Sequence, residues 1–344
     1  MLKRSALPAG LLCLSGIACG ASSAPYLVAD KWPLAGDGGW DYPAVDAAAH
    51  LLYLSRATHV AIVDTTTGKS VGDIADTPGV HGIALAPDLG RGFISAGKAD
   101  LVKVFDLRTR EVIASIAVGS KPDAILYEPH TRRVVVLNGH SDNATVIDAA
   151  SNKVLATIKL GGAPEFARTD GLGHVYVNIE DRNELAALDI EALKVTAHWA
   201  LPGCDGPSGL AFDAMHHRSF SVCANAAMTI LDTQSGKSIA TLPIGMGVDG
   251  AEFDPESQDV FSANGEGTLT VVHEIDPDHF AVSQTLSTAK GARTIALDAQ
   301  AHRLYLPTAN FGPVNPTLLD AHPKPPILPG SFVVLVVAPQ AVMK

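Results

Sequence analysis

Short runs of alternating apolar and polar residues recur along the chain, separated by Gly, Asp, Asn or Pro. One of these runs ends in an aspartate and a turn, as in AIVDTTTGK (61–69) and TILDTQSGK (229–237). Alternation with a period of two is typical of half-buried β-strands. Five copies have the turn aspartate, with spacings of 42, 42, 41 and 43 residues: Asp64, Asp106, Asp148, Asp189 and Asp232. A sixth copy has His273 in its place, and a seventh, 332–340, is degenerate.

Three further runs keep the same phase. A run after a Gly- or Pro-containing turn occurs seven times, at 40–47, 81–88, 122–129, 164–171, 207–214, 249–256 and 293–300. A third run lies between this run and the aspartate run, at 51–56, 92–97, 134–139, 174–179, 219–224, 260–265 and 304–309. A fourth follows the aspartate turn, as in 111–119 and 153–161. Each unit of about 42 residues therefore predicts four short strands.

Four antiparallel strands in a repeat of this length are typical of one β-propeller blade. Parallel β-helices have shorter repeats, and α-solenoids need a helical period that is absent here. The sequence predicts an all-β, seven-bladed propeller. The segment 26–34 reads as a fourth strand with no blade before it, and the last repeat ends with three strands. We therefore expect the N-terminal strand to complete the seventh blade, which removes exposed sheet edges.

The segments VYVNI, VVLNG, VFSAN and VGSKPDAI, with the VID and ILD turns, resemble the YVTN/YncE-type bacterial β-propeller repeats. The resemblance implies the fold and export from the cytoplasm, but no catalytic residue, because the shared residues shape turns and blade cores. A Pro-rich insert, 311–331, departs from the repeat in the last blade. WD40 repeats fit less well, because the aspartate turns lack tryptophan and no Gly-His pair recurs.

The first 24 residues read as a signal peptide, so that 25–344 form the propeller. Lys3 and Arg4 precede an apolar segment too short to span a bilayer, and small residues follow it. This predicts a periplasmic or extracellular protein. Cys19 raises lipoprotein anchoring as an alternative, but Gly16 is a poor match to the leucine usual at that position. No second apolar run reaches membrane length.

The net charge of the chain limits the classes of partner that it is expected to bind. The formal net charge of −11 disfavours phosphate backbones and anionic lipid surfaces, so nucleic acid is not an expected partner. We expect a monomer that binds a small molecule, a cation or a protein. No phosphate-binding loop, nucleophile elbow, zinc-protease motif or EF-hand loop occurs.

The innermost strands of a propeller converge on its central channel, whose mouth is the usual ligand site. At the start of the seven predicted inner strands lie Asp41, His81, Asp123, Glu165, Ser208, Asp249 and Arg293. Crowded carboxylates raise one another's pKa and favour a bound cation or cationic ligand. The simpler interpretation is a water-filled channel whose polar residues pair with one another.

Two functions follow from this set. The first is a non-enzymatic binding or scaffold propeller with an acidic mouth, which requires no cofactor. The alternative is a divalent-metal-assisted hydrolase or lyase, in which Asp123, Glu165 and Asp249 hold Ca²⁺ or Mg²⁺ and His81 acts as acid or base.

Other candidates are expected to be structural. Cys204 and Cys223 fall on the mouth face of the fifth blade, where a disulfide is favoured over free thiols. His216 and His217 are expected to be solvated. His273 and Glu274, which replace a turn aspartate, are expected to be structural. The turn aspartates should cap backbone N–H groups. The insert 311–331 should lie on the mouth face, either as a lid or as an excursion packed on the rim.

Overall fold

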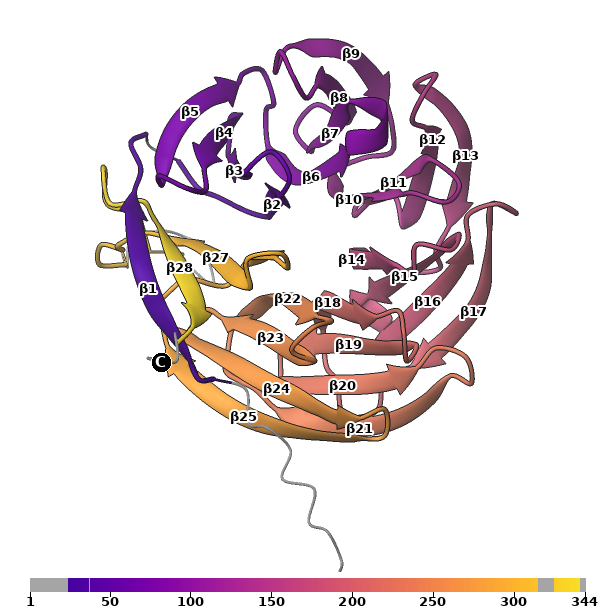
Figure 1. The fold of residues 1–344 in the computed structure, drawn as a ribbon. Coiled ribbons are helices and arrows are strands. Elements are labelled where there is room, and N and C mark those ends of the chain that lie inside the picture. The colour runs from indigo at the N-terminus through magenta and orange to yellow at the C-terminus, as the bar shows by residue number, and fades with distance from the viewer. Residues whose placement is uncertain (1–23, 37, 315–324, 341–344) are drawn as a thin grey trace, which may run out of the picture.

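The computed structural model describes residues 24–36, 38–314 and 325–340. These residues form seven four-stranded antiparallel sheets arranged in a ring (Figure 1). The predicted signal peptide, apart from Ala24, and the middle of the Pro-rich insert lie outside the described residues. No helix in the described ranges is long and apolar enough to cross a membrane.

Each blade runs from an inner to an outer strand, and successive strands pair in order. The first three blades comprise β2 (Pro43–Asp46), β3 (Leu51–Arg56), β4 (His59–Asp64), β5 (Lys69–Ile74); β6 (Val80–Ala86), β7 (Arg91–Ala96), β8 (Leu101–Asp106), β9 (Val112–Ala117); and β10 (Pro122–Glu128), β11 (Arg133–Asn138), β12 (Asn143–Asp148), β13 (Lys153–Lys159). The next three comprise β14 (Pro164–Thr169), β15 (His174–Ile179), β16 (Glu184–Asp189), β17 (Lys194–Ala200); β18 (Pro207–Asp213), β19 (Arg218–Cys223), β20 (Ala227–Asp232), β21 (Lys237–Pro243); and β22 (Val248–Asp254), β23 (Asp259–Asn264), β24 (Thr268–Asp276), β25 (His279–Ser287). Two 3₁₀ turns, η1 (Pro87–Leu89) and η2 (Glu180–Arg182), complete the described elements outside the last blade.

The seventh blade joins the two ends of the chain, as the sequence predicts. Its order from outside to inside is β1 (Tyr26–Pro33), β28 (Val333–Pro339), β27 (Arg303–Thr308) and β26 (Ala296–Asp298). In Figure 1 the indigo β1 lies alongside the yellow β28. The side-chain amide of Gln284 also bonds the backbone N–H and carbonyl of Tyr26, at 2.8 Å each. The N-terminal strand is thus tied to both the last and the sixth blade.

The innermost strand of this blade is shorter than the sequence predicts. The run 293–300 reads as a strand, but only Ala296–Asp298 pairs with β27. The preceding residues bond elsewhere: the Thr294 hydroxyl donates to the carbonyl of Asp41 at 3.0 Å, and Arg293 contacts Asp249. Because both bonds point to neighbouring blades, this segment joins blades instead of extending the sheet.

The core lies between blades, where β-branched and aromatic side chains of neighbouring sheets pack face to face. An arginine at or near the start of the second strand adds a polar clamp in several blades. Its guanidinium donates to backbone carbonyls in the outer turn of the next blade, as with Arg91 to Ala149 and Arg218 to Pro277. Arg133 does the same to Ile190. These arginines are therefore part of the repeat, and their charge serves blade-to-blade attachment.

Candidate functional site at the channel mouth

Local backbone irregularities direct the predicted mouth residues into the channel. The pairing register of five inner strands shifts close to the mouth, between Val80 and Ile83 in β6, and at the equivalent points of β10, β14, β18 and β22. A β-bulge re-aims the side chains around it and is common near binding sites. The irregular segments contain His81, Asp123, Glu165, Ser208 and Asp249. Asp41 lies two residues before β2, and Arg293 lies three residues before β26.

The mouth residues of the first three blades form one connected group. The Nδ1 atom of His81 lies 2.6 Å from a carboxylate oxygen of Asp41 and 3.5 Å from one of Asp123. The Nζ atom of Lys121 lies 3.9 Å from the other oxygen of Asp123. The hydrogen bond to Asp41 raises the pKa of His81, which favours an imidazolium. Gly97 makes room for this ring, because a Cβ there would come within 2.8 Å of it.

The other predicted residues are arranged differently. Nε of Arg293 donates to Asp249 at 2.7 Å, which makes a second ion pair. The Ser208 hydroxyl donates to backbone carbonyls of Val222 and Val248, so it serves the fold. Within the described residues, Glu165 has no hydrogen bond or ion pair. Three of the four carboxylates at the mouth therefore have cationic neighbours, and Glu165 is the exception.

Burial and mutual repulsion set the protonation of these carboxyls. Burial, reinforced by the charges of Asp123 and Asp249, raises the pKa of Glu165 to about 8. Burial also raises the pKa of Asp123 to about 6 and that of Asp249 to about 6, against the opposing effects of His81 and Arg293. The buried Tyr42, whose ring lies 4.9 Å from Phe166, has its pKa raised by burial and by all four carboxylates. The carboxylates thus surround a tyrosine within the channel.

The structure does not gather the metal ligands that the sequence suggests. In the described part of the chain, ligand atoms within 4.8 Å of one another at the mouth belong to Asp41, His81 and Asp123. Glu165 and Asp249 contribute to no such group. Because Asp249 binds Arg293, a cation there would have to displace a guanidinium. The observed group favours an Asp–His–Asp arrangement over a three-carboxylate site.

Two hollows lie on the mouth face, on either side of Trp40. One, of about 390 Å³, is lined by residues that include Asp41, His81, Lys98 and Lys121. The other, of about 510 Å³, is lined by apolar residues and glycines with Lys290 and Arg293. The mouth therefore has carboxylates within the channel and cations around its rim, and its acidity is largely compensated.

The described ends of the Pro-rich insert line the second hollow. Phe311 and Ile327 form an isolated antiparallel bridge, and the amide of Gly312 donates to Pro326 at 2.8 Å. The Phe311 ring lies 6.1 Å from that of Trp40. The insert is thus anchored against the aromatic rim of the mouth, on the face that the sequence predicts.

A disulfide joins Cys204 and Cys223, whose Cα atoms lie 5.4 Å apart. Cys204 lies in the connection that enters blade five, and Cys223 ends β19, opposite Pro207. The bond fixes this connection beside Ser208 on the mouth face.

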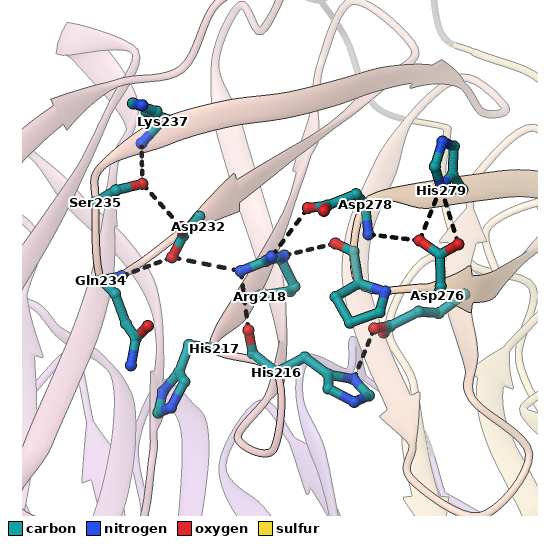
Figure 2. Close-up of polar contacts among 12 residues, drawn as sticks. His216, His217, Arg218, Asp232, Gln234, Ser235, Lys237, Asp276, Asp278 and His279 are labelled. Atoms are coloured by element: carbon teal, nitrogen blue, oxygen red, sulfur yellow. Dashed lines mark hydrogen bonds and ion pairs between the residues drawn. The ribbon is translucent and has the colours of Figure 1, made fainter.

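A second group of ligating side chains lies on the face opposite the mouth, between blades five and six, and it differs from the expectation from the sequence. His216 was expected to be solvated, but its Nδ1 atom lies 2.7 Å from Asp213 and 2.8 Å from Glu274. Asp213 and Glu274 are buried. Figure 2 shows the imidazoles of His216 and His217 pointing in different directions. The two histidines diverge as expected, but the partner of His216 comes from the next blade, which inspection of the HH pair alone does not reveal.

No protein-family model matches the chain, and no curated protein sequence matches it. Among solved structures, it is similar to a chain of hydrazine synthase from Kuenenia stuttgartiensis, with a TM-score of 0.69. The identity is 17%, over 79% of this chain and 94% of that one. At this identity the similarity supports the propeller fold alone. Membership of the YVTN/YncE-type repeats stays a prediction.

The raised pKa of Glu165 predicts a pH-dependent stability. An unfolded glutamate ionises near pH 4.5, whereas folded Glu165 stays protonated up to about pH 8. The folded state therefore binds more protons in this interval, so the free energy of unfolding falls as pH rises through it. We expect Glu165→Gln to increase stability at pH 8 by about 1–3 kcal/mol relative to its effect at pH 4.5, after allowance for partial solvation. Melting curves from pH 4.5 to 8.5 measure this.

Exposed Glu266, also on the mouth face, supplies the matched control. Glu266→Gln should leave the pH dependence of melting unchanged. Parallel curves for the wild type and Glu165→Gln would show that Glu165 ionises normally in the folded protein.

Proposed function

We propose that this protein is an exported, non-enzymatic binding propeller that holds a small organic cation at the channel mouth. The ammonium group would lie among the carboxylates around Tyr42, and the apolar part would lie toward the rim at Trp40. The observation that carries the proposal is Glu165, a carboxyl with no cationic partner among the described residues. Burial, reinforced by the charges of Asp123 and Asp249, raises its pKa to about 8.

The surrounding charges support a cation in preference to an anion. His81, Lys121 and Arg293 each already contact a carboxylate, so none is left to neutralise an anionic ligand within the channel. A ligand cation would restore ionisation of Glu165 and gain a charge-assisted contact, which is typically stronger than a neutral hydrogen bond. The lysines at the rim would repel any cation, so that contact of the ligand's apolar part with Trp40 would have to offset this repulsion.

Calorimetric titration with phenethylamine and its uncharged counterpart phenethyl alcohol tests the proposal. We expect the amine to bind more tightly than the alcohol, and more tightly at pH 8.5 than at pH 6.5. Glu165→Gln should weaken amine binding about 10-fold, equivalent to ~1.4 kcal/mol, while Glu266→Gln leaves it unchanged. Equal affinities for the two compounds, or an unaffected Glu165→Gln variant, would contradict it.

A metal-assisted hydrolase or lyase is the second candidate, favoured by the group Asp41, His81 and Asp123. An ion there would have to replace the proton that His81 shares with Asp41. Elemental analysis of protein purified without chelator decides between the candidates. About one equivalent of divalent metal that Asp123→Asn abolishes would favour the enzyme, whereas amine binding by a wild type whose metal content is the same as that of Asp123→Asn supports the binding function.

A further inference from the structure

The group Asp213, His216 and Glu274 lies on the face opposite the mouth and connects two blades. Asp213 ends β18 and His216 lies in the turn after it, both in blade five, whereas Glu274 belongs to β24 of blade six. One ligand atom from each residue lies within 4.8 Å of the other two. Asp213 is held in place by the backbone N–H groups of Met215 and His216, at 2.9 and 3.2 Å.

The polar atoms of this group lack the partners that burial requires. Within the described residues, three buried side-chain atoms of this group have no hydrogen-bond partner: His216 Nδ1 and Glu274 Oε1 and Oε2. Glu274 is fully buried. The contacts of His216 Nδ1 with Asp213 and Glu274 are short, but neither is aligned as a hydrogen bond. In contrast, His302 makes a 2.6 Å hydrogen bond to Asp254, which ends β22 as Asp213 ends β18. A buried carboxylate without donors is costly unless a cation compensates it.

Both residues that meet here depart from the repeat. The residue after the turn aspartate is elsewhere small, hydroxylic or apolar: Thr65, Leu107, Ala149, Ile190 and Thr233. Only in the sixth copy is it a carboxylate, Glu274. The position of His216, third after the inner strand, is otherwise Ala49, Leu89, Thr131, Leu172, Ser257 or Ala301. Two independent departures that come into contact across a blade boundary are typical of a functional site, since fold stability alone favours the repeat residues.

The nearby cation does not neutralise this group. Arg218 contacts Asp232 at 3.3 Å and Asp278 at 3.2 Å, and Figure 2 shows it between these two carboxylates. Its Nε atom also donates to Pro277, which is the inter-blade clamp of the repeat. Its charge is thus engaged by two other acids, which leaves His216 as the basic side chain in ion-pair contact with both Asp213 and Glu274.

We propose that Asp213, His216 and Glu274 form a binding site for a divalent transition-metal ion of the Zn²⁺ type, which links blades five and six. One imidazole nitrogen and two carboxylates are ligands that Zn²⁺ accepts, whereas Ca²⁺ requires six or more oxygens. Two carboxylates with a neutral histidine balance the charge of a divalent ion. A tetrahedral ion with bonds of about 2.0–2.1 Å needs its ligands about 3.3 Å apart, so the side chains must separate by roughly half an ångström. The His216 side chain is 24% exposed, which leaves access for a water as fourth ligand.

Titration of the metal-free protein with Zn²⁺, against a competing chelator, tests the site. We expect one tight equivalent in the wild type. His216→Ala and Glu274→Thr should each weaken binding by about 100-fold or more, because each removes a ligand. His217→Asn is the matched control beside the site, and asparagine tolerates its positive φ of 57°. Asp123→Asn is the control for the mouth, and both controls should bind as the wild type does.

Melting curves keep the test independent of misfolding. Glu274→Thr installs the residue that blades one and five have at this position, so without metal it should melt above the wild type. Zn²⁺ should raise the melting temperature of the wild type but not that of Glu274→Thr. The site is overturned if the wild type binds no Zn²⁺, if His216→Ala and Glu274→Thr bind it equally well, or if only Asp123→Asn loses it. None of these results depends on the amine site at the mouth.

Discussion

A chain that begins at Ala35 should fail to fold, whereas one that begins at Pro25 should fold as the full chain does. Removing β1 leaves the seventh blade with three strands and exposes the whole edge of β28, which β1 covers from Tyr26 to Pro33. It also removes three buried side chains from the core, those of Tyr26, Trp32 and Leu34. A propeller whose last blade ends in an unpaired apolar edge is prone to edge-to-edge association, and the two ends of its chain are no longer held together.

Size-exclusion chromatography and circular dichroism of the two chains measure this difference. We expect a monomer with a cooperative melt for the chain from Pro25, and aggregates for the chain from Ala35. Trp32→Ala in the full-length chain tests a smaller change, the loss of one buried side chain of β1 with the strand still present. The Trp32 ring lies 5.4 Å from Tyr305 and its indole N–H donates to Asp30. Its loss should cost about 3–5 kcal/mol of unfolding free energy. A cooperative, monomeric melt for the chain from Ala35 would show that closure by β1 is dispensable.

This closure was predictable because the repeat shows that each blade should have four strands. Each blade repeats the same pattern of apolar strands and turns. The last repeat lacks a fourth strand and the N-terminal segment is a strand without a blade, so the second was expected to complete the first. The interior boundaries, such as 51–56 for β3 and 174–179 for β15, match the structure for the same reason. The repeat fails at 293–300, where bonds from Thr294 and Arg293 to neighbouring blades replace sheet pairing.

The site was only partly predictable. The period places one residue of each blade at the mouth, but it does not say how side chains from different blades pair. Asp249 forms an ion pair with Arg293, and the hydroxyl of Ser208 bonds backbone carbonyls instead of facing a ligand. Such pairings depend on which donors and acceptors of different blades lie close together in the fold, and the repeat pattern of the sequence does not contain this information.

The same limit explains the misreading of His216. Its apparent partner in the sequence is His217, and neighbouring side chains in a strand or turn diverge. Its actual partner, Glu274, lies in the next blade. A comparison of all repeats, position by position, would have found the signal, because Glu274 replaces the Thr or apolar residue of other blades. In a repeat protein, departures from the repeat therefore deserve comparison with one another across each blade boundary.

Loss of the Cys204–Cys223 disulfide should reduce the unfolding free energy by about 3 kcal/mol. The two cysteines are 19 residues apart, and the bond restricts this loop in the unfolded chain. Both side chains are buried, so alanine is the appropriate replacement because it leaves no buried hydroxyl. The Cys204→Ala/Cys223→Ala variant should unfold at a lower urea concentration, with a slope no shallower than that of the wild type because its unfolded chain is less restricted.

Reductant separates the bond from the packing of the two sulfurs. Wild-type protein unfolded in the presence of dithiothreitol should approach the stability of the double variant, which should itself be indifferent to dithiothreitol. Protein made in a reducing cytoplasm should have two titratable thiols in the propeller, and protein routed to an oxidising compartment none. If the wild type keeps its full stability under complete reduction, the bond contributes little. The connection beside Ser208 would then be held by its backbone bonds, and the disulfide would no longer support the proposed export.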